Sequence, residues 1–199
     1  MTKLCPRGKA AAKRKMIKGD SSEYELLEKW AKGLSNLNNY KLSCEIGVRE
    51  GLGSKIILDS LQPHEHYGID PYGNLKYQHY DDSPAYTADY TDEMKDRLQK
   101  DLSSYKNFEL FAITDTDFMN IYHHYSPYCF VHFDGPHMTR DVLTEAVWFA
   151  NRAGTNCRFV FDDYPKYNMP LIQSALEPFG FKKLEAGKNK ICLEKRRES

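Results

Sequence analysis

The sequence predicts an α/β fold: an open, mostly parallel sheet with helices on both faces and a C-terminal antiparallel hairpin. Short, nearly continuous apolar segments alternate with segments of helical periodicity, which is the pattern of buried parallel strands and their crossover helices. Several of these apolar segments end in an acidic residue. The last two are separated by a short polar turn, as the two strands of a hairpin are.

The first predicted elements are a helix and a strand. Ser21 or Ser22 can cap a helix, and apolar residues recur at helical spacing from there to Leu34. Residues 41–45 are predicted to form a buried strand, which a glycine turn connects to a helix around residues 56–61. We expect the first helix to pack on the sheet just before this strand.

The later elements follow the same alternation. Further strands are predicted at 66–70, 108–113, 128–133 and 158–161, helices at 139–152 and 171–176, and hairpin strands at 180–184 and 191–195. Gly154 is expected to end the helix that precedes the fifth strand. The alternation predicts a Rossmann-like sheet.

Residues 71–107 are longer than a usual crossover in a compact α/β unit. The segment begins with a loop rich in tyrosine and is predicted to continue as a helix over 91–105. Because disordered segments are poor in aromatic residues, we expect a lid-like insertion within one domain that spans residues 21–199. Two roles stay open for the tyrosines, anchors of the loop or walls of an acceptor pocket.

The charge is unevenly distributed. The chain has 28 basic and 28 acidic residues, and seven of the basic ones lie in residues 1–20, which are predicted to form a flexible tail. The remaining 21 basic residues are outnumbered by the 28 acidic ones. A mildly acidic body argues against a nucleic-acid groove, apart from contacts that the tail could make.

Cysteine use and hydropathy indicate a cytoplasmic protein. The five cysteines include no C-x-x-C pair, and we expect them to be reduced thiols. No apolar run approaches the roughly 20 residues of a membrane helix. The N-terminus lacks the apolar stretch of a secretory signal. The sequence is also compatible with assembly into a homo-oligomer.

The glycine turn after the first strand indicates which ligand the fold binds. Gly47, Gly51 and Gly53 give the order G-x-x-x-G-x-G, which differs from the G-x-G-x-x-G of dinucleotide-binding turns. Glu45 precedes the first glycine and would repel a pyrophosphate, but it can pair with the cationic end of S-adenosylmethionine (SAM). The alternative is an ordinary strand-turn-helix whose glycines only serve the turn.

The other strand-end acids strengthen the nucleotide interpretation. Asp70 lies 25 residues after Glu45, where the carboxylate of a βαβ unit can accept hydrogen bonds from both ribose hydroxyls. Asp115 follows the third strand, where a carboxylate could meet an adenine amino group. Since ligands bind at the carboxyl ends of parallel strands, these acids should gather at one edge of the sheet.

The motifs E-I-G-V-R-E-G, G-I-D-P, D-G-x-H and F-D-D-Y, in this order, resemble those of class I SAM-dependent methyltransferases. They are most similar to the small metal-dependent O-methyltransferases of the macrocin and sugar O-methyltransferase group, over about residues 40–195. The resemblance implies methyl transfer to a hydroxyl of a small molecule or sugar. It also implies a role in cofactor binding for six residues: Glu45, Gly47, Gly51 and Ser54 at the methionine end, Asp70 at the ribose and Asp115 at the adenine.

The same resemblance implies a divalent metal, usually magnesium, bound by Asp134, Asp162 and Asp163. Three converging carboxylates need a cation to offset their repulsion, and hard oxygen ligands select Mg²⁺ or a similar ion. Such a metal would lower the pKa of the acceptor hydroxyl. The alternative is that one of the paired acids caps the next turn.

The catalytic candidates are Asp134 and His137. In much of the group the motif resembles D-G-D-H, whose second acid can take the acceptor proton, but here that position is Pro136. His137 is the nearest titratable side chain and can act as a general base. Its alternative role is a hydrogen bond that supports the metal acids.

Two other functions compete with methyl transfer. An NAD-binding oxidoreductase would explain the βαβ units and Asp70, but it predicts the other glycine order. A noncatalytic binding protein on the same fold would explain the basic tail, but it gives no reason for acids at four strand ends.

Overall fold

The computed structural model describes residues 17, 19, 21–34, 41–122 and 127–196 of the 199-residue chain. The predicted basic tail at 1–20 therefore lies almost entirely outside the described residues. The helices are α1 (Tyr24–Lys32), α2 (Leu52–Leu61), α3 (Asp92–Asp101), α4 (Asp115–Ile121), α5 (Thr139–Ala150) and α6 (Met169–Leu176). The strands are β1 (Leu42–Ile46), β2 (Glu65–Ile69), β3 (Gly73–Tyr77), β4 (Tyr86–Tyr90), β5 (Phe108–Phe111), β6 (Tyr128–Phe133), β7 (Ala153–Phe161), β8 (Phe181–Ala186) and β9 (Ile191–Lys195).

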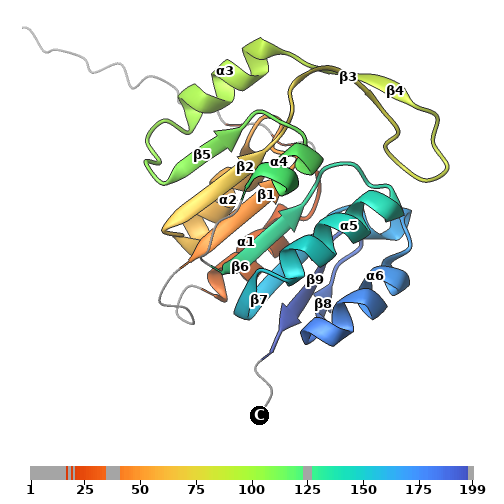
Figure 1. The fold of residues 1–199 in the computed structure, drawn as a ribbon. Coiled ribbons are helices and arrows are strands. Elements are labelled where there is room, and N and C mark those ends of the chain that lie inside the picture. The colour runs from red at the N-terminus through yellow and green to blue at the C-terminus, as the bar shows by residue number, and fades with distance from the viewer. Residues whose placement is uncertain (1–16, 18, 20, 35–40, 123–126, 197–199) are drawn as a thin grey trace, which may run out of the picture.

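Seven strands form one sheet in the order β5-β2-β1-β6-β7-β9-β8, and β3 and β4 form a separate two-stranded sheet (Figure 1). The strands from β5 to β7 pair in parallel, whereas β9 is antiparallel to both β7 and β8. The predicted open, mostly parallel sheet with a C-terminal antiparallel hairpin is confirmed. Because β1 lies at the centre and the strand order reverses there, the site should lie at its carboxyl end.

Helices cover both faces of the sheet. One core cluster joins α4, α5 and α6 to the sheet through side chains such as Phe118, Phe149 and Ile172. A second cluster joins α1 and α2 to the other face through Trp30, Ile57 and Phe130. On this second face a third cluster packs α3 against α2. Every residue of β1 and β6 is buried, because both strands are covered on both faces.

Several boundaries differ from the sequence prediction, most of all at the end of α5 and the start of β7. α5 ends at Ala150, and Gly154 lies inside β7 instead of ending a helix, so this strand starts five residues earlier than predicted. A Cβ at Gly154 would lie 3.3 Å from Cβ of Pro127, so the glycine allows a close approach to the start of β6. At the start of α1, the N-cap is Glu23, and its side chain does not cap the helix.

The helix α4 was not predicted. It has only seven residues, too few to show a clear apolar period, and its N-cap Thr114 accepts a hydrogen bond from the backbone N–H of Asp117. The insertion at 71–107 contains β3, β4 and α3, so the predicted helix in this segment is confirmed at Asp92–Asp101. No helix among the described residues is long and apolar enough to cross a membrane.

Candidate active site

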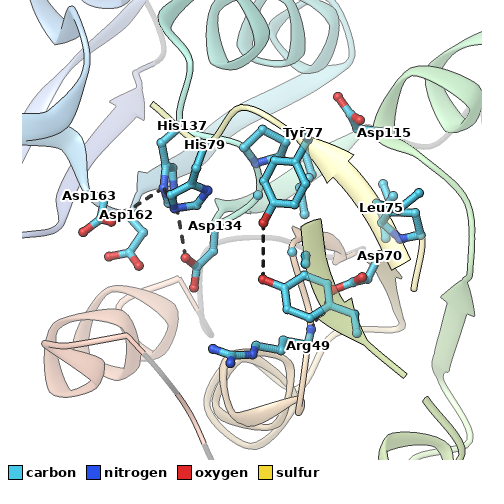
Figure 2. Close-up of a pocket in the computed structure, with 18 of the residues that line it drawn as sticks. Arg49, Asp70, Leu75, Tyr77, His79, Asp115, Asp134, His137, Asp162 and Asp163 are labelled. Carbon is cyan, nitrogen blue, oxygen red and sulfur yellow. Dashed lines mark hydrogen bonds and ion pairs between the residues drawn. The ribbon is translucent and has the colours of Figure 1, made fainter. Parts of the chain in front are cut away.

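A cavity of about 870 Å³ opens at the carboxyl ends of the parallel strands. Its volume is in the range of small-molecule and cofactor sites. Residues that follow β1, β2, β5, β6 and β7 line it, and the β3–β4 hairpin supplies a further wall. Figure 2 shows Asp70 and Asp115 on one side of this cavity and Asp134, Asp162, Asp163 and His137 on the other. The predicted gathering of strand-end acids is therefore present.

Gly47 is the first residue of the glycine turn and lines the cavity. Its φ is 82°, a left-handed conformation that glycine adopts without strain. A Cβ at this position would lie 2.0 Å from the backbone oxygen of Asp134. The structure thus gives a reason for glycine that the sequence did not, because the turn packs directly against the chain that leaves β6.

Glu45 and Ser54 lie behind this turn and, like Gly51, are not among the described residues that line the cavity. Ser54 Oγ donates a hydrogen bond to one oxygen of Glu45, and His132 Nδ1 lies 2.8 Å from the other. His66 Nε2 lies 3.0 Å from the same Ser54 Oγ. The three side chains of Glu45, Ser54 and His132 form a buried polar network under the turn, and the two histidines were missed by the sequence analysis.

Asp70 sits at the end of β2 and holds the turn after β1. It accepts hydrogen bonds from the backbone N–H groups of Arg49 (2.8 Å) and Tyr72 (3.2 Å). Burial raises the pKa of the Asp70 carboxyl, and the backbone donors only partly oppose this. Asp70 thus lines the cavity where a ribose was predicted and also fixes the conformation of its wall.

Asp115 lines the cavity at the start of α4 and contacts a residue that the sequence analysis missed. The buried side chain of Glu145, on α5, lies next to Asp115. Burial and the neighbouring Asp115 charge raise the pKa of Glu145 well above its ordinary value. Nothing in the helical pattern distinguishes Glu145 from the other glutamates of the chain.

The carboxyl groups of Asp134 and Asp162 are close neighbours, and each shifts the pKa of the other. Burial and the Asp162 charge raise the pKa of Asp134, whereas the neighbouring Asp134 carboxyl and the Lys190 charge outweigh burial and lower the pKa of Asp162. Lys190 Nζ lies 2.6 Å from Asp162 Oδ1, and its side chain is fully buried. Ser21 Oγ and Asn189 Nδ2 also donate to Asp162. Asp162 is therefore ionised and already paired with an internal cation.

Asp163 faces a different set of partners. Its Oδ2 accepts a 2.6 Å hydrogen bond from Tyr80 Oη and lies 3.6 Å from His137 Nδ1. The same nitrogen of His137 lies 3.3 Å from Nε2 of His79, which belongs to the insertion. Burial, reinforced by His79, lowers the pKa of His137 to about 4, so the imidazole is neutral near pH 7.

The insertion is attached to the body next to these residues. Asp81 accepts hydrogen bonds from the backbone N–H of Thr139 (2.9 Å) and from its hydroxyl. Thr139 is the first residue of α5, whose N-cap Met138 has no capping side chain, so Asp81 caps this helix from a distant segment. The hydroxyls of Tyr77 and Tyr86 lie 2.8 Å apart over the cavity, in the hairpin.

The predicted three-carboxylate magnesium site does not fit this arrangement. Two groups of side chains in the described part of the chain bring three metal-ligating atoms within 4.8 Å of one another. One consists of His79, His137 and Asp163, and the other of Glu45, His132 and Asp134. Neither combines Asp134, Asp162 and Asp163, because Asp162 is bound to Lys190 and Asp163 turns toward the two histidines.

Comparison with known proteins identifies the family of the fold. A family model described as "Methyltransferase domain" matches residues 44–164. No curated protein matches the chain. Similar solved structures include an rRNA methylase from Streptococcus thermophilus (TM-score 0.58, 12% identity, covering 92% of this chain and 100% of that one). An O-methyltransferase from Bacillus cereus in complex with SAH gives a TM-score of 0.60 at 9% identity, covering 91% of this chain and 84% of that one. The O-methyltransferase TomG from Streptomyces achromogenes, in complex with SAM, gives 0.58 at 12% identity, covering 87% and 79%.

Proposed function

The chain belongs to the methyltransferase-domain family, and on that premise we propose that it transfers a methyl group from SAM to a hydroxyl of a small molecule or sugar. The observation that carries the proposal is that one cavity joins the Gly47 turn, Asp70 and Asp115 to Asp134 and His137. One side offers groups suited to a nucleoside, and the other offers acid and base groups suited to an acceptor. An NAD-dependent oxidoreductase is not favoured by the family.

The residues on the first side fit the cofactor. Gly47 presents backbone toward the cavity, and we assign the methionine end of SAM to it. Glu45, Gly51 and Ser54, which were predicted to bind the same end, act in this proposal by holding the turn from behind. Asp70 is assigned to the ribose hydroxyls and Asp115 to the adenine amino group.

Bound SAM would supply an electrophilic methyl group to the acceptor oxygen. On the second side of the cavity, the neutral His137 can take the acceptor proton. Its Nε2 makes no hydrogen bond to any described residue and lies 4.0 Å from Asp134 Oδ1. In this proposal Nε2 of His137 is the proton acceptor, and Asp134 orients the hydroxyl. Since Asp162 is paired with Lys190, no step of this mechanism runs through a magnesium ion.

The acceptor is proposed to be small because the insertion walls the cavity on one side. The β3–β4 hairpin, including the loop that joins its two strands, forms this wall, and Asp81 in that loop attaches it to α5. Tyrosine hydroxyls and a histidine on that wall offer hydrogen bonds of the kind that orient a polyhydroxylated compound. This supports the pocket-wall role for the tyrosines, although Tyr80 also anchors the loop to Asp163.

Titration calorimetry with SAM, SAH and NAD tests the cofactor assignment. We expect binding of SAM and SAH but not of NAD, and weaker SAM binding by the Asp70→Asn variant, which keeps the size of the side chain. Methyl transfer from labelled SAM to a panel of sugars and other hydroxyl compounds, with and without EDTA, tests the reaction. Failure of the parent protein to bind SAM would refute the proposal. Methyl transfer only to amines or RNA would refute the assignment of a hydroxyl as the acceptor.

A further inference from the structure

We propose that His79, His137 and Asp163 form a binding site for a divalent transition metal of the Zn²⁺ type. The three residues come from separate parts of the chain: the insertion, the segment after β6 and the segment after β7. All three line the cavity. The inference goes beyond the proposed methyl transfer and does not depend on it.

The distances between the ligand atoms are those of a metal site. His137 Nδ1 lies 3.3 Å from His79 Nε2 and 3.6 Å from Asp163 Oδ2. Each of the three residues offers one ligand atom within 4.8 Å of those of the other two. Ligands at about 2.0–2.1 Å from a tetrahedral zinc are about 3.3–3.4 Å apart. Small side-chain movements would therefore bring the three atoms into one coordination sphere.

A hydrogen bond between the imidazoles does not explain the whole arrangement. The Nδ1 atom of His137 has either one proton or one lone pair, so it can serve one partner. It nevertheless faces both His79 Nε2 and Asp163 Oδ2, and the second distance of 3.6 Å is too long for a hydrogen bond. A cation between the three atoms would satisfy all of them at once.

The ligands are held in place by their surroundings. The His137 ring is stacked between the rings of Tyr80 (5.8 Å between centroids) and Tyr167 (5.9 Å), and only 3% of the residue is exposed. Tyr80 Oη fixes Asp163 Oδ2 by a hydrogen bond.

Figure 2 shows His79 and His137 side by side, with Asp163 on one side and Asp134 below them. Asp134 Oδ1 lies 4.0 Å from Nε2 of His137, beyond hydrogen-bond distance but on the side where a carboxylate can support a metal-bound histidine.

The ligand types determine which metal is expected. Two neutral imidazoles and one carboxylate suit Zn²⁺, Co²⁺ and other divalent transition metals, whereas Mg²⁺ prefers oxygen ligands. This set shares only Asp163 with the predicted Asp134, Asp162 and Asp163, and it selects a different kind of metal. A metal on Nδ1 would leave the proton on Nε2, so the metal-bound protein could not use His137 as a base. Through His79 it would also hold the insertion against the strand ends.

Cobalt binding to the full chain tests the site. The protein is treated with a chelator, freed of it and titrated with Co²⁺, whose visible absorption reports coordination by nitrogen and oxygen ligands. We expect a saturable signal without a thiolate charge-transfer band, displaced by Zn²⁺ but not by Mg²⁺. His79→Ala and Asp163→Asn should weaken binding by more than tenfold, since even outer-shell changes cost about 10–100-fold. His64→Ala, which removes an exposed histidine remote from the cavity, is the matched control.

A second measurement does not depend on the variants. Long-range ¹H–¹⁵N spectra of the unmodified protein with Zn²⁺ should show metal bound to His137 through Nδ1 and to His79 through Nε2. Unchanged ring signals of both histidines at saturating Zn²⁺ would overturn the proposal. So would cobalt binding that Asp134→Asn removes and His79→Ala leaves intact, because the carboxylate site would then be the real one. Loss of SAM binding or methyl transfer alone would affect only the proposed function.

Discussion

Lys190 Nζ lies 2.6 Å from Asp162 Oδ1, and the lysine side chain is completely buried. Lys190 stands immediately before β9, and Asp162 follows β7, the strand beside β9 in the sheet. The pair is supported by Ser21, whose hydroxyl contacts both Lys190 and Asp162. A buried lysine thus supplies the positive charge at the position where the sequence predicted a metal ion.

We expect Lys190→Met to destabilise the protein by about 3–5 kcal/mol, because it leaves a buried carboxylate without its cation. Adding Asp162→Asn in the same chain should recover most of this loss, since the uncompensated charge is then removed. Chemical denaturation of the parent, the two single variants and the double variant gives the coupling energy. Additive effects of the two substitutions would contradict the pairing.

The turn at Gly47 predicts a strong effect of a single side chain. Gly47→Val would place a Cβ against the backbone of Asp134 and should abolish measurable SAM binding, because the turn must move away from the cavity. Gly73→Ala is the matched control, since Gly73 also has a positive φ (96°) but no atom within 4 Å of the place that a Cβ would occupy. If calorimetry finds that Gly47→Val binds SAM as tightly as the parent does, the turn is not part of the cofactor site.

Much of the fold follows from local sequence patterns. The seven strands of the main sheet were predicted because their apolar runs are short and most are followed by an acid or a turn residue. The strands β3 and β4 were missed, because the tyrosine-rich segment that contains them has no apolar run and was predicted to be a loop. The start of β7 was missed because Gly154, a typical helix end, here allows a close approach to Pro127. The strand-end acids were found for the same reason as the strands: in a parallel sheet, all carboxyl ends lie at one edge.

The partners of these acids could not be predicted in the same way. Lys190 looks like an ordinary turn residue until β9 is placed next to β7, which depends on the pairing of the hairpin with the sheet. His79 reaches the site only because of the path of the insertion, and that path has no periodic signal. Glu145 is one glutamate of a helix whose orientation decides that it faces Asp115. Such contacts depend on tertiary structure, which neither the strand-end positions nor the family resemblance behind the predicted metal ligands could supply.

Stability should fall as the pH is lowered, and His66 is one cause. Complete burial, reinforced by His132, lowers the pKa of His66 to about 3 from an ordinary value of 6.5. Between these values the unfolded chain binds a proton that the folded chain does not, so the free energy of unfolding decreases toward low pH, by up to about 1.4 kcal/mol per pH unit from this group. His66→Gln, which can still bond Ser43 and Ser54, should flatten the slope in urea denaturation. An identical slope would show that other groups dominate.

The attachment of the insertion can be tested without touching the catalytic candidates. Asp81→Ala removes the cap of α5 and should cost about 1 kcal/mol of stability. It should also increase hydrogen exchange of the hairpin amides, because Asp81 connects the loop to Thr139. Asp82→Ala, at the exposed neighbouring position, is the control. Equal exchange rates in the two variants would mean that the remaining contacts hold the insertion.

The last prediction concerns proton removal. His137→Ala should lower turnover by roughly 10²-fold or more while leaving SAM affinity nearly unchanged, because His137 lies at the acceptor side of the cavity. Since burial lowers the pKa of His137 to about 4, the parent should keep its full rate at neutral pH and lose it only as the pH falls toward that value. Single-turnover kinetics with labelled SAM, across pH and with His64→Ala as control, measure both effects. Turnover of His137→Ala close to that of the parent would assign proton removal to another group, and His137 would then have only a positioning role.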